Sequence, residues 1–172
     1  GISSDEKYYF INTSDHNTSE QYYFGKDEEN PKPKLIKKRK KGVIYSVNSW
    51  GGYFYNHTND DAEDFKIDAC QDLSNQNWKS FIPAKDEVLI GGLAFLNDWI
   101  IRSETSNALG KLIIRNPKTG EENDLNFVDE KVIVPSISLK QRDRNTDEVY
   151  LSYSSPKTPG KTYLYNFKTH NK

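Results

Sequence analysis

A hairpin pattern near the C-terminal end of the chain constrains the fold more than any other feature. Between Tyr150 and Asn166, two short runs of β-branched and aromatic residues flank a turn rich in Ser, Pro, Thr and Gly. Such runs suit the pleated, half-buried surface of a sheet, and Pro and Gly interrupt the pleat. Alternate residues of a strand share one face, so Val149, Leu151 and Tyr153 lie together. The segment therefore predicts a β-hairpin.

The same hairpin recurs at earlier positions. A shift of about 50 residues aligns Trp99–Ser103 with Val149–Tyr153, and two further shifts of about 45 residues reach Tyr53–Tyr55 and Tyr8–Phe10. A mostly-strand unit of roughly 40–50 residues is typical of a propeller blade. The repeat predicts an all-β protein, a partial β-propeller of about three to four four-stranded antiparallel blades. Evenly spaced strands also suit a β-sandwich, which is the alternative.

The repeats are expected to form a single partial β-propeller domain over residues 1–172. Turn and strand patterns divide it into four blades, roughly at 1–41, 42–84, 85–129 and 130–172. The first blade is expected to lack its inner strand, and the last blade its fourth strand.

The third blade illustrates the expected strand plan. Val88–Phe95 is predicted as its inner strand, and Gly91 and Gly92 mark a place where backbones approach closely. After the next strand, Thr105–Ala108 is predicted to turn the chain. Asp124–Val128 is predicted as the outer strand.

Composition narrows the class of protein. Apolar residues make up 34% and aromatic residues 13% of the chain, which suits stacked sheets with amphipathic rings at their margins. A net charge of −1 argues against a general polyanion binder, so no nucleic-acid partner is expected. No apolar run approaches the ~20 residues of a membrane span, and there is no signal peptide, so no membrane attachment is expected.

Two residue types bear on the origin of the chain. Cys70 is the only cysteine, which excludes an internal disulfide and a cysteine-only metal cage and suits a reducing, cytoplasmic location. The absence of Met predicts that the chain is an excised piece of a longer protein.

Two charged segments are weak candidates for binding sites. Lys37–Lys41 could bind nucleic acid or direct localisation, but it lacks interleaved aromatic residues, and a solvated outer strand explains it better. Asn59–Asp64 is acidic but lacks the alternating ligands and the Gly of a calcium loop, so no metal is expected.

Two further sets of residues have simple structural explanations. Glycosylation sequons begin at Asn12, Asn17 and Asn56, and we interpret them as chance occurrences in a chain without a secretory signal. Trp50, Trp78 and Trp99 could form a ligand platform, although packing between blades is the preferred interpretation.

Five segments, in order along the chain, resemble the propeller of the prolyl oligopeptidase family and its oligopeptidase B branch. Tyr150–Asn166 resembles the last propeller blade, in which Ser-Tyr-Ser-Ser is followed by Thr-Pro and an aromatic strand. The others are Lys41–Val47, Tyr53–Asn59, Asn77–Pro83 and Lys118–Glu122. The similarity spans nearly the whole chain.

The resemblance implies a fragment of a seven-bladed propeller that covers the active site of an α/β-hydrolase domain and admits only peptides. The nucleophile elbow Gly-x-Ser-x-Gly is absent, and His16, His57 and His170 have no matching Ser/Asp framework. We therefore expect no catalytic residues, cofactor or metal in this chain, and no peptidase activity from it alone. The alternative function is a stand-alone propeller-type interaction module.

The resemblance also implies partners. These are the α/β-hydrolase domain of the same protein and, in the intact enzyme, peptide substrates. Glu87, Asp98 and Asp129 are the candidates for steering cationic peptides at the central opening. Open blade edges predict self-association of the chain.

Overall fold

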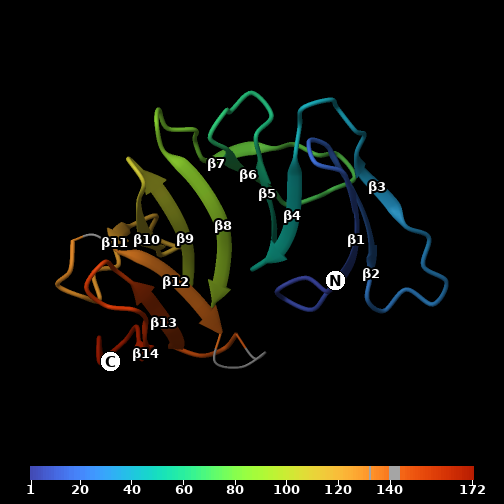
Figure 1. Cartoon of the computed structure of the whole chain (residues 1–172). Helices are drawn as coiled ribbons and strands as arrows, with labels where there is room; N and C mark the ends of the chain where they lie inside the picture. Colours follow the sequence, from blue (N-terminus) through green and yellow to red (C-terminus); the bar gives the residue numbers. More distant parts are fainter. Residues whose placement is uncertain (132, 140–143) are drawn as a thin grey trace. The chain divides into compact units, whose positions relative to one another are not determined.

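The structure, a computed structural model, describes residues 1–131, 133–139 and 144–172 (Figure 1). It divides into two compact units, Gly1–Asp86 and Glu87–Lys172, and each unit contains two antiparallel β-sheets. The all-β prediction is confirmed. Among the described residues, no helix has the length and apolar character needed to cross a membrane.

The first unit contains the first and second sheets. The first sheet has the strand order β1-β2-β3, and the second has the order β4-β5-β6-β7. Their strands are β1 (Tyr8–Ser14), β2 (Ser19–Gly25), β3 (Lys34–Lys37), β4 (Tyr45–Trp50), β5 (Tyr53–Thr58), β6 (Lys66–Cys70) and β7 (Lys79–Ile82). The first sheet has three strands where the second has four.

The second unit contains the third and fourth sheets. The third sheet has the strand order β11-β10-β9-β8, and the fourth has the order β12-β13-β14. Their strands are β8 (Leu89–Leu96), β9 (Trp99–Ser106), β10 (Leu109–Arg115), β11 (Glu122–Asp124), β12 (Val134–Leu139), β13 (Glu148–Ser154) and β14 (Lys161–Asn166). The hairpin predicted between Tyr150 and Asn166 is the β13–β14 pair.

Two of the two-residue hairpin turns have left-handed backbone conformations. Gly51 and Gly52 join β4 to β5 with φ values of 59° and 81°, the left-handed conformation of a type I′ turn. Asn107 and Ala108 join β9 to β10 with φ values of 49° and 60°. The turn predicted at Thr105–Ala108 was therefore too long, because Thr105 and Ser106 continue the β9 ladder.

The outer strand of the third sheet is shorter and earlier than predicted. β11 ends at Asp124, and the last bond to β10 runs from Leu125 N to Leu112 O at 2.8 Å. The segment predicted as the outer strand, Asp124–Val128, leaves the sheet because Phe127 turns into the core of the second unit. We infer that burying the Phe127 ring stabilises the chain more than continuing the backbone hydrogen bonds between β10 and β11 would.

Each unit has a core between its two sheets. In the first unit the buried residues are Phe10, Ile36, Tyr45, Val47, Phe54, Cys70 and Leu73. In the second unit they are Leu96, Ile101, Leu112, Ile114, Phe127, Val149, Leu151, Tyr153, Tyr165 and Phe167. Val149, Leu151 and Tyr153, which were predicted to share one face of a strand, therefore face this core. Trp78 and Trp99 pack against these cores, as the packing interpretation required.

Side chains of β2 bond directly to the backbone of β4 and join the first two sheets. Gln21, only 2% exposed, donates from Nε2 to Val47 O at 3.1 Å and accepts from Val47 N at 2.7 Å. The Ser19 hydroxyl bonds both the amide and the carbonyl of Tyr45. These side chains satisfy backbone groups of β4 that β5 does not reach.

The close approach predicted at Gly91 and Gly92 is confirmed at Gly91 alone, beside a bulge in β8. The pairing with β9 shifts between Ile90 and Leu93. A Cβ atom at Gly91 would overlap Ser103 Oγ and would lie 3.1 Å from the Ser103 carbonyl oxygen. A Cβ atom at Gly92 would meet nothing within 4 Å.

We expect Gly91→Ala to lower the free energy of unfolding by about 1–3 kcal/mol, because the new methyl group forces β8 and β9 apart. Gly92→Ala is the matched control and should change stability by less than about 0.5 kcal/mol. Urea denaturation of both variants measures the difference. Equal effects at the two positions would contradict the close approach.

Candidate functional site

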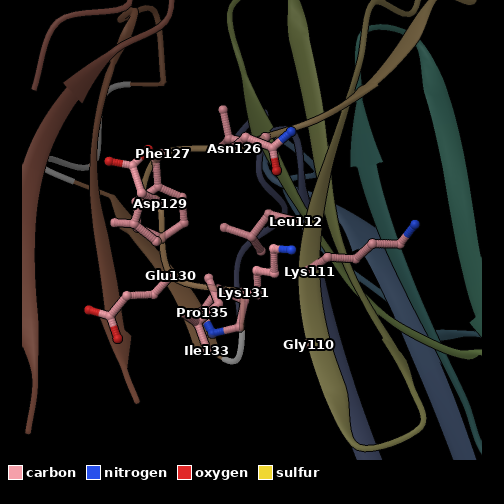
Figure 2. A pocket seen from close by; sticks show the side chains of 12 residues that line it. Gly110, Lys111, Leu112, Asn126, Phe127, Asp129, Glu130, Lys131, Ile133 and Pro135 are labelled. Atoms are coloured by element: carbon pink, nitrogen blue, oxygen red, sulfur yellow. The ribbon is translucent and has the colours of Figure 1, made fainter. Parts of the chain in front are cut away.

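The second unit contains a hollow of about 340 Å³ (Figure 2). It lies beside the first residues of β10, where β11 has already ended, and the start of β12 forms another wall. The lining residues are Gly110, Lys111, Leu112, Leu125, Asn126, Phe127, Val128, Asp129, Glu130, Lys131, Ile133 and Pro135. A Cβ atom at Gly110 would lie 2.8 Å from Pro135 Cδ, so glycine permits this wall to close.

Glu130 anchors one side of the hollow to the β13–β14 turn. Its carboxylate accepts hydrogen bonds from Tyr153 Oη at 2.9 Å, from Thr158 Oγ1 at 2.7 Å and from Ser155 Oγ. The hydroxyl of Ser155, followed by those of Thr158 and Tyr153, lowers the pKa of the Glu130 carboxyl. The same bond from Tyr153 raises the pKa of its phenol. The ionised Glu130 carboxylate therefore accepts three hydrogen bonds and holds the segment that lines the hollow against the β13–β14 hairpin.

The charges around the hollow are mixed. Asp129 is exposed, and Lys111 lies 3.6 Å from Asp124 and 3.8 Å from Glu104. Figure 2 shows the side chains of Lys111 and Glu130 extending away from the middle of the hollow in opposite directions. Leu112 and Phe127 supply the apolar part of the lining. The arrangement can accept a small mixed polar and apolar group, and its described lining residues include no paired nucleophile and base.

The three acidic candidates do not gather at one place. Glu87 is exposed in the turn before β8, and Asp98 lies in the turn after β8. Eight strand residues separate those turns, a span of about 25 Å. Asp98 also pairs with Lys118 at 2.6 Å. Only Asp129 lines the hollow.

A buried ionic network lies within the third sheet, and it was not predicted from the sequence. Arg102 is 3% exposed and Glu104 is 2% exposed. Arg102 donates from Nε to Glu104 Oε1 at 2.8 Å and binds both oxygens of Glu122 at 2.8 and 2.9 Å. Arg115 adds a bond to Glu122 at 2.8 Å. Alternation along β9 placed both charged residues on one face, but only strand pairing with β10 and β11 brings Glu122 to them.

Glu122 is held in its ionised form. Partial burial opposes ionisation, but hydrogen bonds from Arg102 and Arg115 outweigh it and lower the pKa of Glu122 from 4.5 to about 2. Because the folded-state pKa is depressed, this stabilisation is present above about pH 4.5 and is lost as pH falls toward 2. Glu122 is thus ionised at neutral pH.

Comparison with known proteins identifies the family. All of the chain, residues 1–172, matches the family described as prolyl oligopeptidase, N-terminal beta-propeller domain. The chain belongs to this family. The predicted partial β-propeller is therefore confirmed, and the four antiparallel sheets are consistent with it.

Relatives of this propeller family agree in sequence and in fold. The chain is 29% identical over 138 residues to dipeptidyl aminopeptidase BI from Pseudoxanthomonas mexicana and 24% identical over 172 residues to Protease 2 from Moraxella lacunata. These matches cover 78% and 99% of this chain but only 19% and 24% of the relatives. The chain thus spans about a quarter or less of the length of these curated relatives.

Solved structures support the propeller fold. Oligopeptidase B from Trypanosoma brucei, in a closed form with covalently bound antipain, matches with a TM-score of 0.87 at 22% identity. Oligopeptidase B from Leishmania major matches with a TM-score of 0.84 at 14% identity. Each alignment covers 99% of this chain and 26% of the other.

Two of the three histidines of this propeller chain have local contacts, with Phe65 and with Tyr165. His57 stacks on Phe65 with ring centroids 4.6 Å apart, and His170 Nδ1 lies 3.0 Å from the Tyr165 hydroxyl. His16 is exposed in the turn between β1 and β2. In the part of the chain that the structure describes, no three His, Cys, Asp or Glu side chains are placed to hold a metal ion.

The lone cysteine lies in an apolar setting. Cys70 is buried beside a second hollow of about 430 Å³ near β6 and β7. Burial raises the pKa of the Cys70 thiol to about 11. The thiol is therefore protonated at neutral pH and is a poor nucleophile.

The charged segment after β3 takes part in local ion pairs. Arg39 lies 3.3 Å from Asp15 and 3.4 Å from Glu20, and Lys40 lies 2.6 Å from Asp60. The basic run therefore connects the segment after β3 to β2 and to the turns that contain Asp15 and Asp60. It was predicted as part of an outer strand, but β3 ends at Lys37.

The acidic segment and the sequons have structural explanations. The Asn59 side chain donates to Gly42 O at 3.0 Å and accepts from Ile44 N at 2.7 Å, so it fixes the chain before β4. Asn56 is fully buried in β5, which excludes glycosylation of that sequon in the folded protein.

Proposed function

We propose that this chain is the non-catalytic propeller portion of an oligopeptidase B-like serine peptidase. In this proposal it gates the access of peptides to the active site of an α/β-hydrolase domain in the same protein. The observation that supports it most is the match of the entire chain to the propeller domain of the prolyl oligopeptidase family. The paired sheets with apolar cores supply a rigid wall, and the chemistry is assigned to the rest of the protein.

Peptide hydrolysis by the protein that contains this chain is the direct test. We expect cleavage of short peptides with basic residues, sensitivity to a serine-directed inhibitor, and no cleavage of folded proteins. The 172-residue chain alone should be inactive. An intact protein without peptidase activity, or activity of the chain alone, would contradict the proposal.

We expect neutralisation of the acidic candidates to weaken the capture of cationic peptides. Glu87→Gln with Asp129→Asn should lower kcat/KM for a cationic peptide several-fold at low salt, because a negative potential at an opening raises the local concentration of cations. Asp98→Asn should add little, because Lys118 already pairs with Asp98. Steady-state kinetics of the intact enzyme at two salt concentrations measures the effect.

The matched control is Glu29→Gln, which removes an exposed carboxylate from the loop between β2 and β3. It should leave the kinetics unchanged, as should every variant assayed with a neutral peptide. Unchanged kinetics of the double variant with cationic peptides would remove the steering role while leaving the peptidase assignment intact.

The alternative is a stand-alone interaction module that assembles through its open sheets. The specific observation in its favour is apolar exposure on two sheets: Tyr9 and Ile11 on β1, and Tyr150 and Leu164 on the fourth sheet, are 36–44% exposed. The reading frame beyond Lys172 discriminates the two. A Gly-x-Ser-x-Gly segment followed by Asp and His supports the peptidase, and a stop codon supports the module.

We expect the isolated chain to self-associate through these faces. Ile11→Lys combined with Leu164→Lys should shift it toward monomer, because lysine on an open sheet face opposes sheet-to-sheet docking. Light scattering measures the mass, and Lys38→Glu on an exposed loop is the control. A wild-type chain that is monomeric at high concentration would contradict this expectation.

We also propose a cytoplasmic location. An unpaired, buried thiol at Cys70 is compatible with a reducing compartment. Fractionation of cells that express the intact protein is the test, and recovery outside the cytoplasmic fraction would contradict the proposal.

A further inference from the structure

A buried amide without a protein partner lies in the interior of the first unit. Asn56 is in the middle of β5 and is 0% exposed. Neither Nδ2 nor Oδ1 of its side chain has a hydrogen-bond partner among the described residues. Nearly all buried polar side-chain atoms have at least one partner, either in the protein or in an ordered water molecule.

The surroundings of this amide are partly polar. Asn56 shares a face of the second sheet with Phe54, whose ring lies 5.0 Å from that of Tyr8 in the first sheet. The amide therefore faces the space between the two sheets. Its cross-strand neighbours are Val47 on β4 and Asp68 on β6. The Asp68 side chain is only 15% exposed.

The same interior contains a second partnerless donor. Trp78 packs against the core of the first unit, and its Nε1 is buried without a hydrogen-bond partner among the described residues. Lys37 Nζ lies 5.3 Å from the centre of the Trp78 ring, and burial lowers the pKa of this lysine. The space between the sheets thus contains several polar groups, in contrast to a purely apolar core.

We propose that Asn56 binds an internal water molecule between the first and second sheets. The amide needs an acceptor for Nδ2 and a donor for Oδ1, and water supplies both. Chloride would satisfy only Nδ2, and a cation would satisfy only Oδ1. Buried waters typically make about three hydrogen bonds to such groups, and the Asp68 carboxylate is a further acceptor on the same face.

A crystal structure of the protein that contains this chain, at a resolution that defines internal waters, is the primary test. We expect one ordered water within about 3.2 Å of Asn56 Nδ2 or Oδ1. Direct bonding of the amide to protein atoms, or an amide without any neighbouring density, would overturn the proposal.

Asn56→Leu supplies an independent test, because leucine has a similar volume and cannot hold the water. If the water is bound to the amide, it should disappear from the structure of this variant. A water that persists at the same place in the variant would overturn the proposal, because its binding would then not depend on Asn56. Asn12→Leu, the same change at an exposed position of β1, is the control and should leave the water in place.

Discussion

Arg102→Leu is expected to lower the free energy of unfolding by about 3–5 kcal/mol, because it removes the 2.8 Å contact of the buried Glu104 carboxylate and leaves the longer 3.8 Å contact with the partly exposed Lys111. The side chain of Glu104 is 2% exposed, so water cannot replace the guanidinium there. Glu122 would lose both of its bonds to Arg102 and keep the one to Arg115. Urea denaturation at neutral pH measures the loss.

Two comparisons separate the buried charge from simple loss of an arginine. Arg115→Leu removes a more exposed guanidinium from the same carboxylate and should cost about 1 kcal/mol or less. Arg102→Leu combined with Glu104→Leu should recover part of the loss, because the buried carboxylate is removed together with its partner. Equal effects of Arg102→Leu and Arg115→Leu would contradict the burial argument.

The pH dependence of stability gives a third readout of this network. The wild-type protein should lose the contribution of Glu122 as pH falls from about 4.5 toward 2. In Arg102→Leu the pKa of Glu122 should rise toward its ordinary value, so the difference between wild type and variant should shrink over that interval. A difference that stays constant across it would assign the loss to packing.

Gln21→Leu is expected to lower the free energy of unfolding by about 2–4 kcal/mol, because both backbone groups of Val47 would remain buried and unpaired. Gln21 and Val47 are each 2% exposed, so water cannot replace the amide without opening the space between the sheets. Leucine retains most of the side-chain volume, and the loss therefore reports the two hydrogen bonds. Urea denaturation gives the free energy, and hydrogen exchange at the Val47 amide gives its local cause.

The neighbouring residue of β2 supplies the control. Tyr22→Phe removes a hydroxyl that bonds Glu20 on the outer side of the first sheet and should change stability by about 0.5 kcal/mol or less. Slow exchange at Val47 that survives in Gln21→Leu would show that the bond to Gln21 does not protect this amide.

The sequence predicted the local structure well where side-chain alternation and turn chemistry agree. The aligned segments that start at Tyr8, Tyr53 and Trp99 are the beginnings of β1, β5 and β9. Of the paired glycines of β8, Gly91 was correctly assigned to a close approach, and Gly92 was not. These features are local, because they depend on residues within a few positions of one another in the chain.

The sequence failed where a distant contact competes with the local pattern. Residues 124–128 have a strand-like pattern, but Phe127 leaves the sheet because the core of the second unit buries its ring. The amide of Gln21 appeared as an ordinary polar position, since its partner lies 26 residues away on another sheet. The ion pairs of Lys37–Lys41 likewise could not be predicted, because their partners Asp15, Glu20 and Asp60 are distant in sequence and come near only in the folded chain.

By itself, the sequence determined the repeated hairpins, and with them the all-β class and the family resemblance. These follow from alternation with a period of two residues and from glycines at turns, which act before any sheet packs. The tertiary structure alone decided which polar side chains are buried and what they bind. Arg102, Glu104 and Gln21 are ordinary surface-type residues until neighbouring strands exclude water, and only then do their partners determine stability.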